Sequence, residues 1–254
     1  MIGCIIQARM GSSRLPGKVL KSVTNMTSVL QFQLKQLSFS ESIEKIVIAT
    51  TTLDEDVPIV TFCRENNIEC FRGEPKNVLD RYYQCAKRYN FSIIVRIPSD
   101  KPLIDPKIVD DAIRHHNAYD YITNFLTASY PSGTEVELLS FKTLKDVWQK
   151  AELPSELEHV TSYIHTHQNE FNILNIEHPN DLSHLGWAVD RIEDLDLVRQ
   201  IVLKIEKRPI LLEDILELFG REPQLIGINK NVDRNEGNIK SLKEDQDYLN
   251  HNKK

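Results

Sequence analysis

The chain has 254 residues, of which 41% are hydrophobic and 27% are charged, proportions ordinary for a globular protein. This length suits one sizeable α/β domain or two small ones. Acidic residues outnumber basic ones by 37 to 31, and the formal net charge of -6 argues against an extended nucleic-acid-binding surface. We therefore expect no nucleic-acid partner, while a local cationic pocket is compatible with this charge balance.

The cellular location is predicted from features that the sequence lacks. No apolar run approaches the roughly 18–20 residues that a transmembrane helix needs, so no membrane partner is expected. The first residues, MIGCIIQAR, show no basic leader followed by a long apolar stretch, as a signal peptide would have. No two cysteines are spaced C-x-x-C, which favours reduced thiols over a zinc site. These features predict a cytoplasmic protein.

The first half of the chain alternates between apolar, β-branched runs and segments with helical spacing. The runs predict strands at residues 2–7, 45–50, 68–71 and 92–97. Helices are predicted near residues 30–37 and at 57–66, 77–89 and 105–116. Asp105 and Pro106 suit the cap and the first position of the last helix. The alternation predicts an α/β fold with a Rossmann-like, mostly parallel sheet flanked by helices.

The second half of the chain is mixed, and it contains no internal repeat. Strands are predicted at residues 119–124 and 135–140, and helices at 156–167, 194–207 and 211–219. We expect one α/β domain over residues 1–227, with two halves that meet at about residue 118. Residues 228–254 are polar and poor in apolar periodicity. They are expected to form a tail that is weakly ordered or packs late against the body.

A loop rich in anion-binding groups follows the first predicted strand. Glycine lets backbone N–H groups approach an anion closely, and arginine and lysine neutralise its charge, so the loop suits a polyphosphate. It is not a Walker A loop, because five residues separate its glycines and Val19 follows its lysine. A solvated basic loop is the alternative. The groups concerned are Arg9, Gly11, Ser12, Ser13, Arg14, Gly17 and Lys18.

Polar residues also follow the next three predicted strands. In a parallel sheet the carboxyl ends of the strands share one edge, where ligands bind. Four consecutive strand ends with polar loops are stronger evidence for a site than any one of them. The later residues are Thr50, Thr51 and Thr52, then Arg72 and Gly73, then Ser99 and Asp100.

Residues 6–18, IQARMGSSRLPGK, resemble the nucleotide-binding signature of the cytidylyltransferase family. The resemblance is greatest to the SpsF-like branch, associated with spore-coat polysaccharide biosynthesis. The chain is also similar to CMP-Kdo synthetases and, more distantly, to CMP-sialic acid synthetases. The similarity covers about residues 2–205. It continues in VLDRY at 78–82, RIPSDKPLIDP at 96–106, YPSGTEVE at 130–137, EHVT at 158–161 and VDRIEDL at 189–195.

This resemblance implies the fold of nucleotide-diphospho-sugar transferases and a CTP-dependent reaction. Family members join the α-phosphate of CTP to an acceptor oxygen and release pyrophosphate, with Mg²⁺ or Mn²⁺ as cofactor. The half up to about residue 118 would bind the nucleotide, and residues 119–227 would hold the acceptor and form a homodimer. The residues that match nucleotide-binding positions are Ala8, Arg9, Gly11, Ser12, Ser13, Arg14, Lys18, Thr50, Thr51, Arg72 and Ser99.

The resemblance also implies catalytic, metal-binding and acceptor-binding residues. Arg9, Lys18 and Asp100 would be catalytic, and Asp100 and Asp190 would hold the metal ion. Five of the candidate residues have a structural alternative. Asp100 could be a turn residue and Asp190 a helix cap. Arg72 and Arg81 could form salt bridges, and His159 could be a structural histidine. The acceptor-binding candidates are Lys101, Arg81, Glu135, Glu137 and His159.

The acceptor is expected to be a small anion. It could be a phosphate monoester, such as a phosphosugar, phosphopolyol or phosphoamino acid, or it could be the hydroxyl of an acidic sugar. A phosphate oxygen needs no general base, and Lys101 adds a cation where relatives usually have a neutral residue, which favours a phosphate. Relatives also commonly have glycine at Ser99 and often aspartate at Glu135. The product would serve surface or capsular polysaccharide synthesis.

Two other functions are compatible with parts of the sequence. A nucleotide-sugar-dependent glycosyltransferase needs a D-x-D-type carboxylate pair, and Asp194 and Asp196 have that spacing, but in a predicted helix. A non-catalytic nucleotide-binding protein is the third possibility. The presence of Lys18, Asp100 and Asp190 argues against it.

Overall fold

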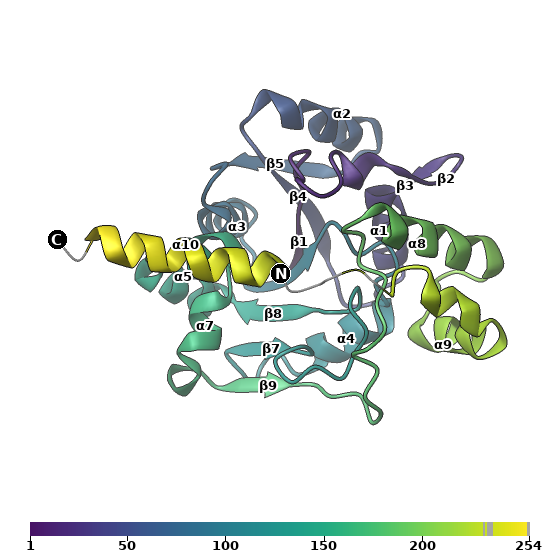
Figure 1. Cartoon of the computed structure of the whole chain (residues 1–254). Coiled ribbons are helices and arrows are strands. Elements are labelled where there is room, and N and C mark those ends of the chain that lie inside the picture. Colours follow the sequence, from purple (N-terminus) through teal and green to yellow (C-terminus); the bar gives the residue numbers. More distant parts are fainter. Residues whose placement is uncertain (231, 233–235, 253–254) are drawn as a thin grey trace.

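The computed structural model describes residues 1–230, 232 and 236–252. Within them, seven strands form one sheet in the order β5-β4-β1-β6-β8-β7-β9 (Figure 1). β8 runs antiparallel to β6 and β7, and the other neighbouring strands are parallel, which confirms the predicted mostly parallel sheet. The strands are β1 Ile2–Gln7, β4 Lys45–Thr51, β5 Glu69–Gly73, β6 Ile93–Pro98, β7 Tyr121–Thr123, β8 Glu137–Ser140 and β9 Ile173–Asn175.

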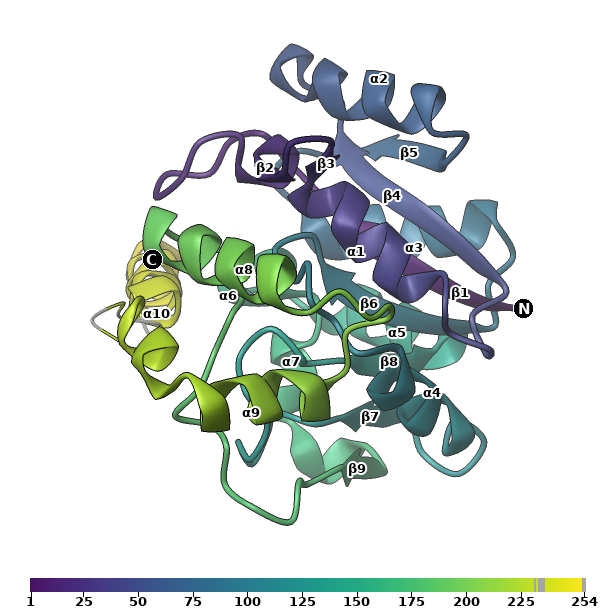
Figure 2. The same cartoon turned by 90° about the vertical axis from the view of Figure 1, so that its right-hand side faces the viewer.

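Helices cover both faces of this sheet, which explains why its central strands are apolar on both sides. Helices α1, α2 and α4 pack against one face, and α3, α5 and α7 against the other. Helices α8 and α9 form a further layer beside α1 (Figure 2). The helices are α1 Val29–Leu37, α2 Val57–Glu65, α3 Val78–Arg88, α4 Pro106–Arg114, α5 Phe141–Lys150, α6 Pro154–His159, α7 Ser162–Thr166, α8 Ile192–Lys204, α9 Leu212–Arg221 and α10 Glu236–Asn252.

The elements predicted for the first half are present with boundaries shifted by a few residues. Asp105 caps α4 as expected, because its side chain accepts a hydrogen bond from the Lys107 amide at 2.8 Å. The hairpin of β2 Ser22–Thr24 and β3 Thr27–Ser28 was not predicted. None of the helices in the described part of the chain is both long and apolar enough to cross a membrane.

The second half differs from the sequence expectation in four places. Helix α5 and strand β9 were not predicted. The helix expected at 156–167 is split into α6 and α7, because Val160 has a φ of 62° and breaks the helical backbone between them. The polar tail also contains the helix α10, which packs against α6 through the Ser155 amide and Asp245. It is therefore a docked element in this structure.

Two backbone hydrogen bonds hold the segment that leads to α8. The Trp187 amide donates to the Ser132 carbonyl at 2.7 Å, and the Ser132 amide donates to the Leu185 carbonyl at 3.1 Å. Gly133 follows with a φ of 106°, a backbone conformation that residues other than glycine rarely adopt. These hydrogen bonds join the loop before β8 to residues 185–187, and so they fix the start of the segment that carries Asp190.

Replacing Gly133 with alanine should destabilise the fold by about 2–4 kcal/mol, through backbone strain and overpacking. The new Cβ would lie 2.8 Å from both the Ala188 nitrogen and the Trp187 ring. Gly220→Ala in α9 is the matched control, because a Cβ there meets nothing within 4 Å. It should raise stability by about 0.5–1 kcal/mol. Urea unfolding measures both changes, and equal changes at the two sites would contradict this account.

Candidate active site

A cavity of about 520 Å³ lies at the carboxyl ends of β1 and β6. This is the edge where the parallel sheet was expected to bind a ligand. The loop after β1, the end of β6, the start of α3, the end of α6, the segment before α8 and helix α10 all contribute to it. Its lining residues are Gln7, Ala8, Arg9, Gly11, Ser12, Ser13, Arg14, Lys18, Val19, Val78, Arg81, Arg96, Pro98, Ser99, Asp100, Glu158, His159, Asp190, Ser241 and Glu244.

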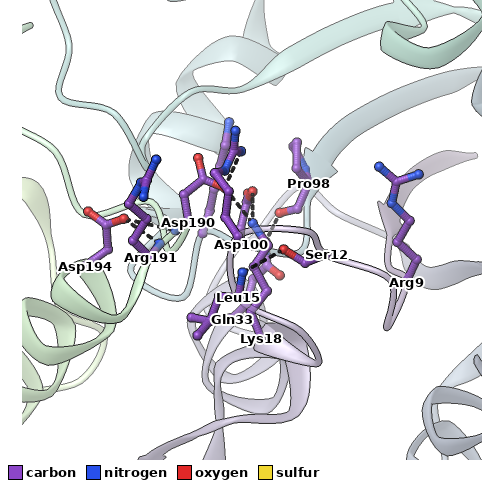
Figure 3. Close-up of polar contacts among 12 residues, drawn as sticks. Arg9, Ser12, Leu15, Lys18, Gln33, Pro98, Asp100, Asp190, Arg191 and Asp194 are labelled. Carbon is purple, nitrogen blue, oxygen red and sulfur yellow. Dashed lines mark hydrogen bonds and ion pairs between the residues drawn. The ribbon is translucent and has the colours of Figure 1, made fainter. Parts of the chain in front are cut away.

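One lysine joins three segments of this cavity. The Lys18 Nζ lies 2.9 Å from Asp100 Oδ2 and 2.8 Å from Asp190 Oδ1 (Figure 3). Arg14 adds a second cation, 2.9 Å from the same Asp190 oxygen. Because 82 and 172 residues separate Lys18 from its two partners, only the fold brings these groups together. The structure thus places the two predicted metal ligands against one cation.

The charges of this group stabilise one another. Burial opposes the charged form of Lys18, but the carboxylates of Asp100 and Asp190 outweigh it and hold the pKa of Lys18 above its ordinary value. Burial likewise opposes ionisation of Asp190, but Lys18 and Arg14 hold the pKa of Asp190 below its ordinary value. The alternative role of Asp190 as a helix cap is not the one observed. Asp194 instead accepts from the Asp190 and Arg191 amides at the start of α8.

The loop after β1 is folded back on itself. The Gly17 amide donates to the Met10 carbonyl at 3.0 Å, and Gly17 has a φ of 67°, which turns the chain into the short helix that begins at Lys18. The Met10 amide donates to Asp56 Oδ1 at 2.6 Å. Gly11 is pressed close to Glu55, whose Oε1 would lie 2.9 Å from an added Cβ. The loop is therefore held in shape by α2 and its preceding turn, rather than being a freely solvated basic segment.

The outer cations of the loop are less constrained. Arg9 pairs with Glu158 of α6 at 3.0 Å, and the two side chains are 51% and 40% exposed. An ion pair with this exposure contributes little to the stability of the fold. Arg9 can therefore exchange Glu158 for an anionic ligand at little cost in free energy. In Figure 3 Arg9 stands apart from the cluster around Lys18. It could therefore contact a different part of a long ligand.

Several predicted nucleotide-binding residues lie beneath the cavity and not on its surface. Thr50 and Thr51 are buried at the end of β4 and are not lining residues. The Thr51 hydroxyl donates to Asp56, the residue that holds the Met10 amide. Arg72 donates to the Thr51 carbonyl at 3.0 Å and to the Leu53 carbonyl at 3.1 Å. Their observed contacts support the loop after β1 from below.

Three predicted acceptor-binding residues also lie outside the cavity lining. Lys101 pairs with Glu135 at 3.0 Å and donates to its carbonyl at 2.9 Å. The Glu135 carboxylate in turn accepts from the Gly133 amide at 2.7 Å. Lys101 is therefore neutralised within the protein. Its charge no longer supports the expectation of a phosphate acceptor.

Glu137 anchors an arginine that the sequence reasoning did not single out. Its carboxylate pairs with Arg96 of β6, accepts from the Tyr121 hydroxyl at 2.6 Å and accepts from the Thr161 hydroxyl. The Arg96 and Glu137 side chains are 9% and 3% exposed. Burial opposes both charges, yet each partner's charge outweighs it, so the pKa of Arg96 is raised and that of Glu137 is lowered. Arg96 lines the cavity and Glu137 stands behind it.

The remaining acceptor candidates do line the cavity. Arg81 is buried, and its guanidinium donates to the Glu74 and Pro75 carbonyls at 3.2 and 3.3 Å. His159 contacts the Ser241 hydroxyl of α10 through Nε2, with 2.7 Å between the two atoms. Burial lowers the pKa of His159, which favours a neutral imidazole at pH 7. No sequence signal pointed to Ser241 or Glu244, because the polar tail shows no apolar periodicity.

The chemistry of the donor set suits a divalent metal ion. Asp100 and Asp190 already direct oxygen atoms at one cation, the Lys18 ammonium. Mg²⁺ prefers oxygen ligands and commonly binds one or two carboxylates together with substrate phosphates. Among the described residues, no group of three or more histidine, cysteine, aspartate or glutamate side chains could hold a metal on its own. A metal at this site would therefore complete its coordination with oxygen atoms from water or from a substrate.

Comparison with known proteins identifies the family to which this chain belongs. The profile of the cytidylyltransferase family matches residues 3–236. The spore coat polysaccharide biosynthesis protein SpsF of Bacillus subtilis (strain 168) is 30% identical over an alignment 230 residues long, which covers 86% of this chain and 94% of SpsF. The match spans nearly all of that relative, so the similarity is not confined to the nucleotide loop.

Two solved structures are similar to the fold. A cytidylyltransferase from Leptospira borgpetersenii superposes with a TM-score of 0.86 and 30% identity, over 91% of this chain and 98% of its own. A CMP-2-keto-3-deoxy-manno-octonic acid synthetase solved with CTP superposes with a TM-score of 0.62 and 17% identity, over 80% of this chain and 98% of its own. The second likeness concerns the fold alone, that of the nucleotide-diphospho-sugar transferases. This chain belongs to the cytidylyltransferase family, in its SpsF-like branch, and is a nucleotidyltransferase.

Proposed function

We propose that this enzyme transfers the cytidylyl group of CTP to a small anionic acceptor and releases pyrophosphate. The observation that carries the proposal is the convergence of Lys18 and Arg14 with Asp100 and Asp190 in one cavity. The family supplies the nucleotide, and the cavity supplies cations for the phosphates and carboxylates for a metal ion. The product would enter surface or capsular polysaccharide synthesis, a role suggested by the name of the SpsF relative.

The triphosphate would lie on the loop after β1. Arg9, Arg14 and Lys18 offer positive charge there, and Ser12 and Ser13 offer hydroxyl groups beside Gly11. The leaving pyrophosphate gains charge as the bond to the α-phosphorus breaks, and fixed cations stabilise that charge in the transition state. Because Asp56 holds this loop through the Met10 amide, the loop is organised before the substrate arrives.

Asp100 and Asp190 would hold the metal ion, Mg²⁺ or Mn²⁺. When bound, the ion supplies positive charge to the phosphate oxygens. Lys18 would then exchange one of its carboxylate contacts for a phosphate oxygen. Before that exchange, the two carboxylates hold the pKa of Lys18 above its ordinary value, so its ammonium is charged when the substrate arrives.

The acceptor oxygen attacks the α-phosphorus in line with the departing pyrophosphate. A new P–O bond to the acceptor forms as the bond to pyrophosphate breaks. If the acceptor is a sugar hydroxyl, its proton needs a base, and His159 is a neutral imidazole on the cavity wall. If it is a phosphate monoester, the attacking oxygen is already ionised, and Arg81 and Arg96 offer cations in the same cavity.

The two other functions find less support. For a glycosyltransferase, the carboxylates of a D-x-D pair should face the cavity. Asp194 is buried and caps α8, and Asp196 pairs with Arg199 at 2.9 Å on the surface of the same helix. A non-catalytic nucleotide-binding protein would not need two carboxylates at the lysine of a phosphate loop. A cytoplasmic location and a homodimer formed through the second half remain part of the proposal.

Pyrophosphate release tests the reaction. The enzyme is incubated with CTP and Mg²⁺, and with a pool of acidic sugars or a pool of phosphate monoesters. We expect release with CTP and one pool, and little with ATP, GTP or UTP. The pool that supports release identifies the attacking group. If CTP binds but neither pool gives release, the proposed transfer to an anionic acceptor is wrong.

Asp100→Asn should reduce turnover by about two orders of magnitude or more, because one of the two proposed metal ligands loses its charge. Raising the Mg²⁺ concentration should recover part of the loss. The control is Asp196→Asn, the same chemical change on an exposed carboxylate of α8 that does not line the cavity. Its turnover should stay within about twofold of the unaltered enzyme, since surface substitutions have small effects. Equal turnover in the two variants would remove Asp100 from the mechanism.

A further inference from the structure

Helix α10 contributes directly to the wall of the active-site cavity. Ser241 and Glu244 both line the cavity that contains Lys18, Asp100 and Asp190. They are three positions apart on the helix, so they lie on the same face. Figure 1 shows α10 as the last element of the chain, in yellow, crossing in front of the sheet. A chain segment distant in sequence from the nucleotide loop thus forms part of the same site.

Helix α10 contacts both ends of the short helix α6. The Ser155 amide, near the start of α6, donates to Asp245 Oδ1 at 2.9 Å. His159, the last residue of α6, contacts the Ser241 hydroxyl at 2.7 Å. Ser241 is buried in this contact. These two contacts, on consecutive turns of α10, fix which face of the helix looks into the cavity.

The wall formed by α10 lies outside the residues that the family profile matches. The profile ends at residue 236, where α10 begins. The matched segment contains the loop after β1 and both aspartates. The groups proposed to bind the nucleotide and the metal ion therefore do not include α10, which leaves the acceptor as the substrate that this helix could contact.

The charge of the wall shows which substrate it could contact. A triphosphate needs cations, and these lie on the loop after β1. The Glu244 carboxylate has acceptor oxygens and no donor, so it suits groups that donate hydrogen bonds rather than phosphates. On the same side of the cavity are Glu158 and the neutral His159. This side therefore suits the uncharged or ammonium-bearing part of an acceptor.

We propose that α10 forms the acceptor-selecting wall of the site and that Ser241 and Glu244 are specificity-determining residues. The wall selects an acceptor whose body carries hydroxyl or ammonium groups, which donate hydrogen bonds to the Glu244 carboxylate. Arg81 and Arg96 take the anionic group of the same acceptor. This inference rests on the proposed cytidylyl transfer and adds the chemical class of the acceptor.

Binding of small probes to the enzyme tests the proposal without turnover. The protein is saturated with Mg²⁺ and α,β-methylene-CTP, which should not transfer its cytidylyl group. Saturation-transfer NMR then compares glucose 1-phosphate, glycerol phosphate and phosphoethanolamine, all rich in donors, with ethyl phosphate. The unaltered enzyme should prefer at least one donor-rich probe by about tenfold. If no donor-rich probe is preferred, the proposed acceptor class is wrong.

Glu244→Ala removes the acceptor oxygens and should remove most of this preference, while the affinity for α,β-methylene-CTP stays within about twofold. Asp247→Ala is the matched control, because Asp247 is exposed on the same helix and does not line the cavity. It should keep the preference. A preference retained in Glu244→Ala overturns the proposal. So does a loss of nucleotide affinity in that variant, which would place Glu244 at the nucleotide.

A second pair of variants tests the seating of the helix. Asp245→Ala removes the oxygen that accepts from the Ser155 amide, and it should weaken the preference because α10 is no longer held in place. Asp245→Asn keeps an acceptor oxygen and should restore the preference. If both variants bind the probes as the unaltered enzyme does, α10 does not position the wall. A probe preference without pyrophosphate release would reject the proposed reaction, and with it the acceptor role of the wall, and would leave α10 as part of a small-molecule binding site.

Discussion

The ion pairs of Lys18 with Asp100 and Asp190 are the interactions on which the candidate site depends. They connect the loop after β1, the end of β6 and the segment before α8 at one point. Each carboxylate needs a cation because it is largely removed from water, and Lys18 needs both carboxylates for the same reason. The three segments therefore hold one another in place before any substrate binds. Exchange of these contacts with a metal ion and phosphates is the simplest way to load such a site.

The fold brings these groups together through two independent constraints. A parallel sheet puts the ends of β1 and β6 side by side, which places Lys18 and Asp100 at one edge. Asp190 comes from outside the sheet, and its position depends on the backbone hydrogen bonds that join Ser132 to Leu185 and Trp187. The Val189 amide completes the connection by donating to the Asp100 carbonyl at 2.8 Å. The site thus combines the shared edge of a parallel sheet with a segment that backbone hydrogen bonds hold outside the sheet.

Much of this arrangement could be predicted from the sequence, and the reasons for the failures are physical. Local apolar patterns and cap residues indicate the strands and helices of the first half, and a parallel sheet then follows. The resemblance of residues 6–18 to a known signature predicted a nucleotide loop, and several residues of that loop line the cavity. The split at Val160 could not be predicted, because local sequence favours a helix and the tertiary contact of Thr161 with Glu137 opposes it. The place of α10 depends on docking to α6, which leaves no periodic apolar signal in the tail.

The buried pair of Arg96 and Glu137 limits how this enzyme can change over evolutionary time. Removing either partner alone leaves an unpaired charge among buried side chains. This lowers the free energy of unfolding by about 3–5 kcal/mol, which is a large part of the stability of an ordinary domain. Replacing both at once with apolar residues of similar volume carries no such penalty. A lineage that loses this arginine must therefore lose the glutamate in nearly the same step, and the two positions are expected to vary together among descendants of this chain. Because Arg96 also faces the cavity, such a paired exchange would alter substrate recognition in a single evolutionary event.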